Sequence, residues 1–122
     1  MMRTVRRRRP PLTVQVSHVR IKLGELIDAV ADVFEMPQAY IVGRRRYPDI
    51  ALARAVLMYL AGERYGFGLS ATGRALGVHH TTVLAARRKM AARMESDPDL
   101  RDLVCRVAAL LELNLEDARS IA

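Results

Sequence analysis

Two short groups of polar side chains are the residues of this chain with the clearest chemical potential. Residues 79–82 read His-His-Thr-Thr, and residues 87–89 read Arg-Arg-Lys. Imidazole and hydroxyl groups at the first turn of a helix can hydrogen-bond to base edges or to phosphates, because the unpaired backbone N–H groups there also bind anions. The chemistry that these residues indicate is therefore recognition of DNA.

No other pattern in the sequence predicts a reaction or a metal site. Because consecutive helical residues point about 100° apart, His79 and His80 do not converge on one ion, and no cysteine or third histidine lies near them. No acidic pair or nucleophile–base pair forms a catalytic arrangement either. We expect no enzymatic activity, no metal and no cofactor. The single cysteine, Cys105, lies in an apolar-periodic stretch, which predicts a small buried side chain.

The charge of the chain is positive and unevenly distributed. The formal net charge is +7 over 122 residues, of which 51% are hydrophobic and 5% aromatic, so we expect one small domain with an aliphatic core. Residues 44–93 carry ten basic and two acidic side chains, whereas residues 94–122 carry three basic and seven acidic ones. The basic block favours an anionic partner such as nucleic acid. No apolar run is long enough to span a membrane, so we expect a cytoplasmic protein associated with the nucleoid.

Apolar residues recur at helical spacing through most of the chain, which predicts an all-α fold. The expected helices cover residues 23–34, 38–42, 50–65, 69–76, 80–94 and 98 onward, with residues 113–122 left open. We expect Asp49 to cap the third helix and Asp97 the last, with Pro98 at its first position. The expected organisation is a flexible basic tail (1–16), a DNA-binding domain (17–94), and a C-terminal amphipathic helix with an acidic tail (95–122).

Residues 69–88 have the spacing of a helix-turn-helix unit. Gly73 stands where the two helices would approach most closely, and Gly77 can take the left-handed conformation that ends the first helix. The inward positions are apolar, namely Leu76, Val78, Val83, Ala86 and Met90. The opposite face carries His80, Thr81, Ala85 and Arg88. An ordinary helical hairpin with a solvated charged face is the alternative, but the two glycines and the basic block favour DNA binding.

Residues 80–84, His-Thr-Thr-Val-Leu, followed by Ala86 and Arg88-Lys89, resemble the C-terminal DNA-binding domain (domain IV) of the bacterial chromosomal replication initiator DnaA. The resemblance covers roughly residues 21–94 and includes a basic loop, matched here by Arg44-Arg45-Arg46. It implies a compact, Trp-repressor-like helical domain that binds double-stranded DNA in a sequence-specific manner.

The resemblance also implies roles for individual residues. The minor-groove arginine of the family falls on Arg46, and its base-reading histidine and threonine fall on His80 and Thr81. We expect His79 and Arg88 to add base contacts. The residues expected on phosphates are Arg44, Arg45, Arg54, Thr82, Arg87 and Lys89.

Three departures from the family pattern bear on specificity. His79 replaces the family's aspartate, and the turn before it is one residue shorter. Ser70 replaces a proline that abuts the DNA, and Leu52-Ala53-Arg54 replaces an Arg-Pro-Arg lead into the long helix. The base sequence that is read should therefore differ from the family's standard site.

The expected function is regulation of transcription. No Gly-x-x-x-x-Gly-Lys loop is present, so an ATP-driven initiator is not expected, and short DnaA-like regulators of prophage or gene-transfer-agent genes fit the description. One alternative is an accessory protein of the replication origin. Another is an adaptor whose C-terminal segment docks RNA polymerase, a sigma factor or a companion protein, since Leu113, Leu115 and Ile121 have no evident core role. The Arg-rich tail should add non-specific DNA affinity.

Overall fold

The computed structural model describes residues 17, 19–43, 45 and 47–121, and every regular element among them is an α-helix. The helices in chain order are α2 (Leu23–Phe34), α3 (Gln38–Val42), α4 (Pro48–Glu63), α5 (Leu69–Leu76), α6 (His80–Met94) and α7 (Pro98–Ile121). The all-α prediction is confirmed. The predicted tail at residues 1–16 lies outside the described residues.

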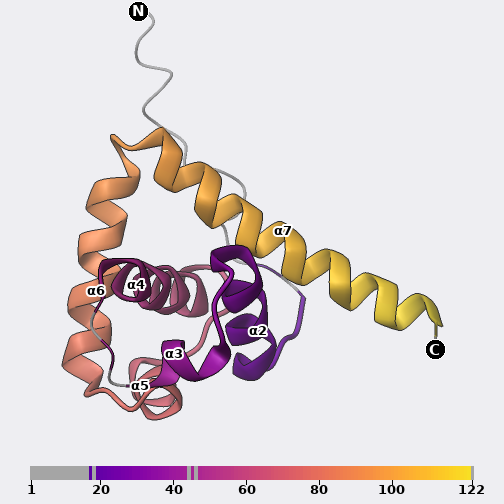
Figure 1. The fold of residues 1–122 in the computed structure, drawn as a ribbon, viewed down its shortest axis with the longest axis horizontal. Helices are drawn as coiled ribbons and strands as arrows, with labels where there is room; N and C mark the ends of the chain where they lie inside the picture. Colours follow the sequence, from indigo (N-terminus) through magenta and orange to yellow (C-terminus); the bar gives the residue numbers. More distant parts are fainter. Residues whose placement is uncertain (1–16, 18, 44, 46, 122) are drawn as a thin grey trace, which may run out of the picture.

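The centre of the molecule is α4, which contacts the other five helices described here. In Figure 1 it is seen almost end-on, between α6 and α2. The apolar residues on one side of α4 are buried, namely Ile50, Ala53, Val56, Leu57, Leu60 and Ala61, and so are Met58 and Tyr59 on its other sides. A helix that is apolar on most of its circumference must be enclosed by other elements. The core is accordingly arranged around α4 rather than along one face of it.

The start of α4 differs from the prediction. Tyr47 occupies the N-cap position, Pro48 is the first helical residue and Asp49 lies within the first turn. Proline is well suited to this place, because the N–H that it lacks would have no helical partner. Asp49 still favours the helix start through its negative charge, and its Oδ1 accepts a hydrogen bond from the Ile50 N–H at 2.9 Å.

The helix-turn-helix predicted for residues 69–88 is confirmed. Gly77 has φ 73° and ends α5 in the left-handed conformation. A Cβ atom added to Gly73 would lie 2.6 Å from the Val78 carbonyl oxygen, so only glycine allows the chain to pass so closely. Of the predicted inward residues, Leu76, Val83 and Met90 are buried, and Val78 and Ala86 are half-buried against the same core.

The sequence pattern left the structure of residues 113–122 undecided. In the structure α7 continues through this segment to Ile121. Its start agrees with the prediction, since the Asp97 Oδ1 accepts a hydrogen bond from the Leu100 N–H at 3.1 Å. Its inner face is buried in the core through Leu100, Val104, Val107, Ala108 and Leu111. Cys105 is half-buried rather than fully buried. Figure 1 shows the C-terminal end of α7 extending past α2.

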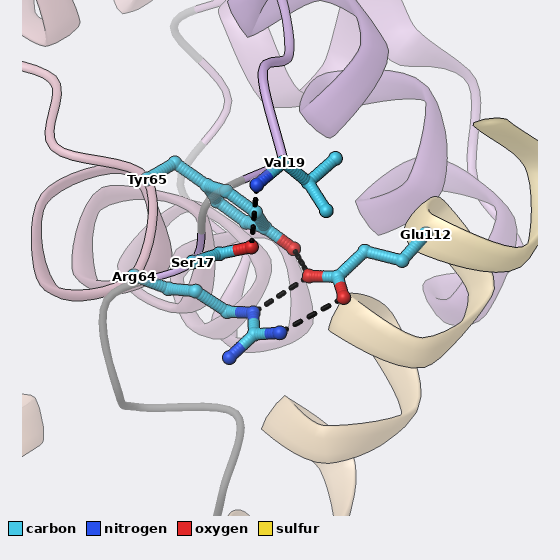
Figure 2. Close-up of polar contacts among 5 residues, drawn as sticks. All are labelled: Ser17, Val19, Arg64, Tyr65 and Glu112. Atoms are coloured by element: carbon cyan, nitrogen blue, oxygen red, sulfur yellow. Dashed lines mark hydrogen bonds and ion pairs between the residues drawn. The ribbon is translucent and has the colours of Figure 1, made fainter. Parts of the chain in front are cut away.

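A polar cluster attaches α7 to the end of α4, and we call its three residues, Arg64, Tyr65 and Glu112, the α4–α7 clamp (Figure 2). The Arg64 guanidinium donates to both carboxylate oxygens of Glu112, at 2.6 and 2.8 Å, and the Tyr65 hydroxyl donates to Oε2 at 2.5 Å. The Ser17 N–H donates to the Arg64 carbonyl oxygen at 2.8 Å, which also brings the lead into α2 to this point.

Within the described ranges, no helix is both long enough and apolar enough to cross a membrane.

Candidate nucleic-acid interface

The outer face of α6 carries most of the polar residues that the sequence singled out. His80, Thr81 and Thr82 in its first turn, and Arg88 and Lys89 further along, are all exposed. Thr81 and Arg88 stand opposite Val83 and Met90, whose burial fixes the rotation of the helix about its axis. The predicted outward presentation of these side chains is therefore observed, whereas their contacts with DNA stay predictions.

His79 precedes α6 and acts as its N-cap residue. The Thr81 N–H donates to the His79 Nδ1 at 3.3 Å, and the Thr81 Oγ1 lies 2.8 Å from the same nitrogen. The rings of His79 and His80 lie against one another, with centroids 4.3 Å apart. The imidazole thus occupies the place where an aspartate, asparagine or serine commonly caps a helix.

Arg87 is a correction to the predicted phosphate contacts. Its Nε donates to the Met58 carbonyl oxygen at 2.7 Å, and its Nη2 donates to the Phe67 carbonyl oxygen at 3.2 Å and to the Thr72 Oγ1 at 3.0 Å. Burial lowers the pKa of Arg87 from its ordinary value. A guanidinium that is occupied by three internal acceptors is not directed at DNA.

Helical spacing could have revealed the inward position of Arg87. It follows the buried Val83 by four residues and precedes the buried Met90 by three, so it shares their side of α6. A second signal is Gly62 on α4, where an added Cβ would lie 2.3 Å from the Arg87 Cζ. The missing side chain at residue 62 leaves the room that the guanidinium fills.

The basic loop is anchored to two helices. The Arg54 Nη1, from α4, donates to the Gly43 carbonyl oxygen at 2.9 Å, at the entrance of the loop. The Arg45 guanidinium carbon lies 4.4 Å from the centroid of the Tyr40 ring of α3, a cation–π contact. Arg44 and Arg46 lie outside the described residues. Arg54 is half-buried, so the structure gives it a supporting contact on the loop, and its predicted phosphate contact stays a prediction.

Two further candidates were not singled out from the sequence. Arg74, in the last turn of α5, is an exposed cation on the helix that precedes the turn. Tyr47 is 63% exposed between the basic loop and α4. Its ring and hydroxyl can add a stacking or hydrogen-bonding contact beside the basic loop. The sequence carried only a weak signal for either residue.

The electrostatics of this surface suit an anion rather than a cation. The first turn of α6 contains no acidic residue, and its exposed side chains are an imidazole and two hydroxyls at the positive end of the helix dipole. In the part of the chain that the structure describes, no group of three or more His, Cys, Asp or Glu side chains could hold a metal ion. The arrangement can therefore bind phosphate and present hydrogen-bonding groups to bases.

Comparison with known proteins places residues 24–90, more than half of the chain, in the family described as bacterial DnaA protein helix-turn-helix. Similar proteins include chromosomal replication initiator protein DnaA 1 of Protochlamydia amoebophila, 34% identical over 87 residues, which are 71% of this chain and 19% of that protein. They also include DnaA of Methylacidiphilum infernorum, 36% identical over 83 residues, which are 67% of this chain and 18% of that protein. The chain spans about a fifth of the length of these relatives. The matched region runs from α2 into α6 and leaves α7 outside it.

Proposed function

This chain belongs to the family of bacterial DnaA helix-turn-helix domains, and from that premise we propose that it binds double-stranded DNA in a sequence-specific manner and regulates transcription. The observation that carries the proposal is the outward face of α6, on which Thr81 and Arg88 are exposed opposite the fully buried Val83, with His80 exposed at the start of the helix. A helix presented in this way fits the major groove of DNA.

In the proposed complex, the first turn of α6 contacts base edges from the major groove. His80, Thr81 and Arg88 read the bases, and Thr82 and Lys89 bind flanking phosphates. The basic loop reaches the adjacent minor groove through Arg46, and Arg44 and Arg45 bind its phosphates. Arg74 on α5 is added as a phosphate contact, because it is an exposed cation close in sequence to the turn.

Binding to duplex DNA tests the general proposal. With about six phosphates neutralised, the logarithm of the affinity should fall against the logarithm of salt concentration with a slope of about −5. Fluorescence anisotropy at several salt concentrations measures the slope. A slope near zero would contradict the proposal.

Sequence specificity has its own test. Thr81→Ala should weaken binding to the preferred site by about 1–3 kcal/mol and leave binding to random DNA almost unchanged. Asn114→Ala, an exposed position on α7, is the matched control and should alter neither affinity. An equal loss on both DNA types would show that α6 is not the reading helix.

Regulation of transcription is tested by the position of the sites in the cell. A map of bound sites in the native host should place them beside the promoters of the regulated genes. A concentration of sites at the replication origin would instead support an accessory role in replication.

A second candidate function, docking of a protein partner through α7, is favoured by one observation. Leu113 is 55% exposed, and the exposed acidic residues Glu116 and Asp117 follow it on α7. RNA polymerase, a sigma factor or a companion protein could supply a complementary surface. Leu113→Glu should then abolish regulation of a reporter gene without changing DNA affinity, whereas full reporter regulation would contradict docking at this residue.

A further inference from the structure

The contact between His79 and Thr81 determines where the hydroxyl hydrogen of Thr81 points. The Thr81 backbone N–H can only donate, and it is directed at the His79 Nδ1 at 3.3 Å. This nitrogen must therefore carry a lone pair, which places the ring proton on Nε2. An Nδ1 that accepts cannot also donate, so the Thr81 hydroxyl, 2.8 Å away, gives its hydrogen to the same nitrogen.

A threonine hydroxyl has one hydrogen to donate and two lone pairs that accept. With its hydrogen directed at His79, Thr81 offers only lone pairs to a ligand. The hydrogen-bond donors in the major groove are the exocyclic amines, N6 of adenine and N4 of cytosine, whereas N7, O6 and O4 are acceptors. Thr81 in this state can hydrogen-bond to the amines and not to those acceptors.

We propose that His79 is a specificity-determining residue that acts through Thr81, by holding its hydroxyl as an acceptor for an exocyclic amine of adenine or cytosine. The inference rests on the proposed DNA binding and extends it from a site on the protein to a class of base. It also changes the expected role of His79 from a direct base contact to a positioning residue.

Two features hold the His79 ring for this role. Its backbone is in the extended conformation of an N-cap residue, with φ −72° and ψ 150°, so its side chain turns back over the first turn of α6. The His80 ring lies against it with centroids 4.3 Å apart. The acceptor is thus placed by the helix start itself and exists before DNA arrives.

The test separates the orienting role from the capping role. His79→Gly removes the acceptor but keeps a residue that N-cap positions tolerate, while His79→Asn keeps an acceptor oxygen at the cap. Thr81→Val removes the hydroxyl and keeps the shape of the side chain. Selection from randomised duplexes with wild-type protein and with Thr81→Val first identifies the base pair that depends on Thr81.

Base analogues at that position then identify the atom that is read. Removing the exocyclic amine, with purine in place of adenine or 2-pyrimidinone in place of cytosine, should weaken wild-type binding about tenfold and have clearly less effect on Thr81→Val. His79→Asn should keep the tenfold effect. His79→Gly should reduce it to about that of Thr81→Val. Replacing N7 of the purine should affect wild type and Thr81→Val equally.

Several results would overturn the inference. One is a tenfold amine effect that persists in His79→Gly. Another is a coupling of Thr81 to a base acceptor such as N7 instead of the amine. A uniform loss of affinity for all duplexes in His79→Gly, together with a lower melting temperature, would show that the residue only stabilises the helix. Failure of the wild-type protein to bind any duplex is a distinct outcome, since it would refute the proposed function itself.

Discussion

Arg87 shows how one residue can connect three parts of this fold. It lies on α6 and donates to a carbonyl of α4, to the carbonyl of Phe67 before α5, and to the hydroxyl of Thr72 within α5. The two helices of the helix-turn-helix are thereby connected to the central helix through a single guanidinium. Hydrogen bonds to a charged group are stronger than those between neutral groups.

Arg87→Ala should lower the free energy of unfolding by about 2–3 kcal/mol, because it removes three internal hydrogen bonds made by a charged donor. Urea unfolding followed by circular dichroism measures the change. Arg88→Ala, at the next and exposed position, is the matched control and should leave stability within about 0.5 kcal/mol of wild type. If the two variants were equally stable, Arg87 would not have the structural role assigned to it.

Gly73 offers a second prediction at the residue scale. Gly73→Ala should lower the free energy of unfolding by about 1–2 kcal/mol, because the close approach of the new Cβ to the Val78 carbonyl outweighs the better helix propensity of alanine. Gly24→Ala is the comparison, since a Cβ there would meet nothing within 4 Å, and it should not destabilise the protein. Thermal unfolding of both variants decides the matter. A stabilised Gly73→Ala would mean that α5 and α6 can move apart at little cost.

At the scale of elements, the α4–α7 clamp couples the last helix to the central one. The hydrogen bonds from Arg64 lower the pKa of Glu112, and they outweigh burial, which acts in the opposite direction. Burial, followed by the hydrogen bond to Glu112, raises the pKa of Tyr65. Both shifts describe one arrangement, in which an ionised carboxylate accepts from a guanidinium and a neutral phenol.

The clamp predicts an acid-sensitive contribution to stability. Because the folded state lowers the pKa of Glu112, its contribution is present above the unfolded value of about 4.3 and is lost as pH falls through the lower folded value. Glu112→Gln should remove about 1–2 kcal/mol at pH 7 and proportionally less in acid. Urea unfolding at a series of pH values tests this. Asp28→Asn, at an exposed position on α2, should keep the wild-type difference between neutral and acid pH.

At the scale of the whole molecule, α7 completes the core mainly through residues up to Leu111. Beyond them Leu115, for which the sequence indicated no core role, is half-buried and packs against the same core. Removing residues 98–122 would delete the buried side chains of Leu100, Val104, Val107 and Leu111 and expose the core surface that they cover. Burial of each side chain is worth about 1.5–3 kcal/mol, so the domain should unfold. Removing residues 113–122 retains these residues and the clamp. This shorter variant loses the half-buried Leu115, so it should fold with a somewhat lower melting temperature and bind DNA with wild-type affinity. Its failure to fold would assign the end of α7 to the core.

The elements that local sequence determines were the predictable ones. The left-handed φ of Gly77 depends on neighbours within a few residues, and the structure agrees with the prediction for it. The same holds for the burial of Val83 and Met90 and the exposure of His80 and Thr81. The predicted first residue of α4 was wrong because both Asp49 and Pro48 suit the start of a helix, and the helix begins at the proline. The role of Arg87 depends on Met58 and Phe67, which are distant in sequence. The clamp joins residues 47 and 48 positions apart, a pairing that no local pattern encodes.

The Arg54 contact with the basic loop and the Arg87 contact with Met58 have a joint consequence, since both start or end on α4. One rigid rod thus sets the separation between the loop and the reading helix. Suppose that the basic loop and α6 enter neighbouring grooves as proposed. One extra base pair inserted between the DNA segment that contacts the loop and the segment that contacts α6 would rotate one segment relative to the other by about 34° and displace it along the duplex. The protein could not adjust to that change without breaking internal hydrogen bonds, so operator length should be as strictly selected as operator sequence.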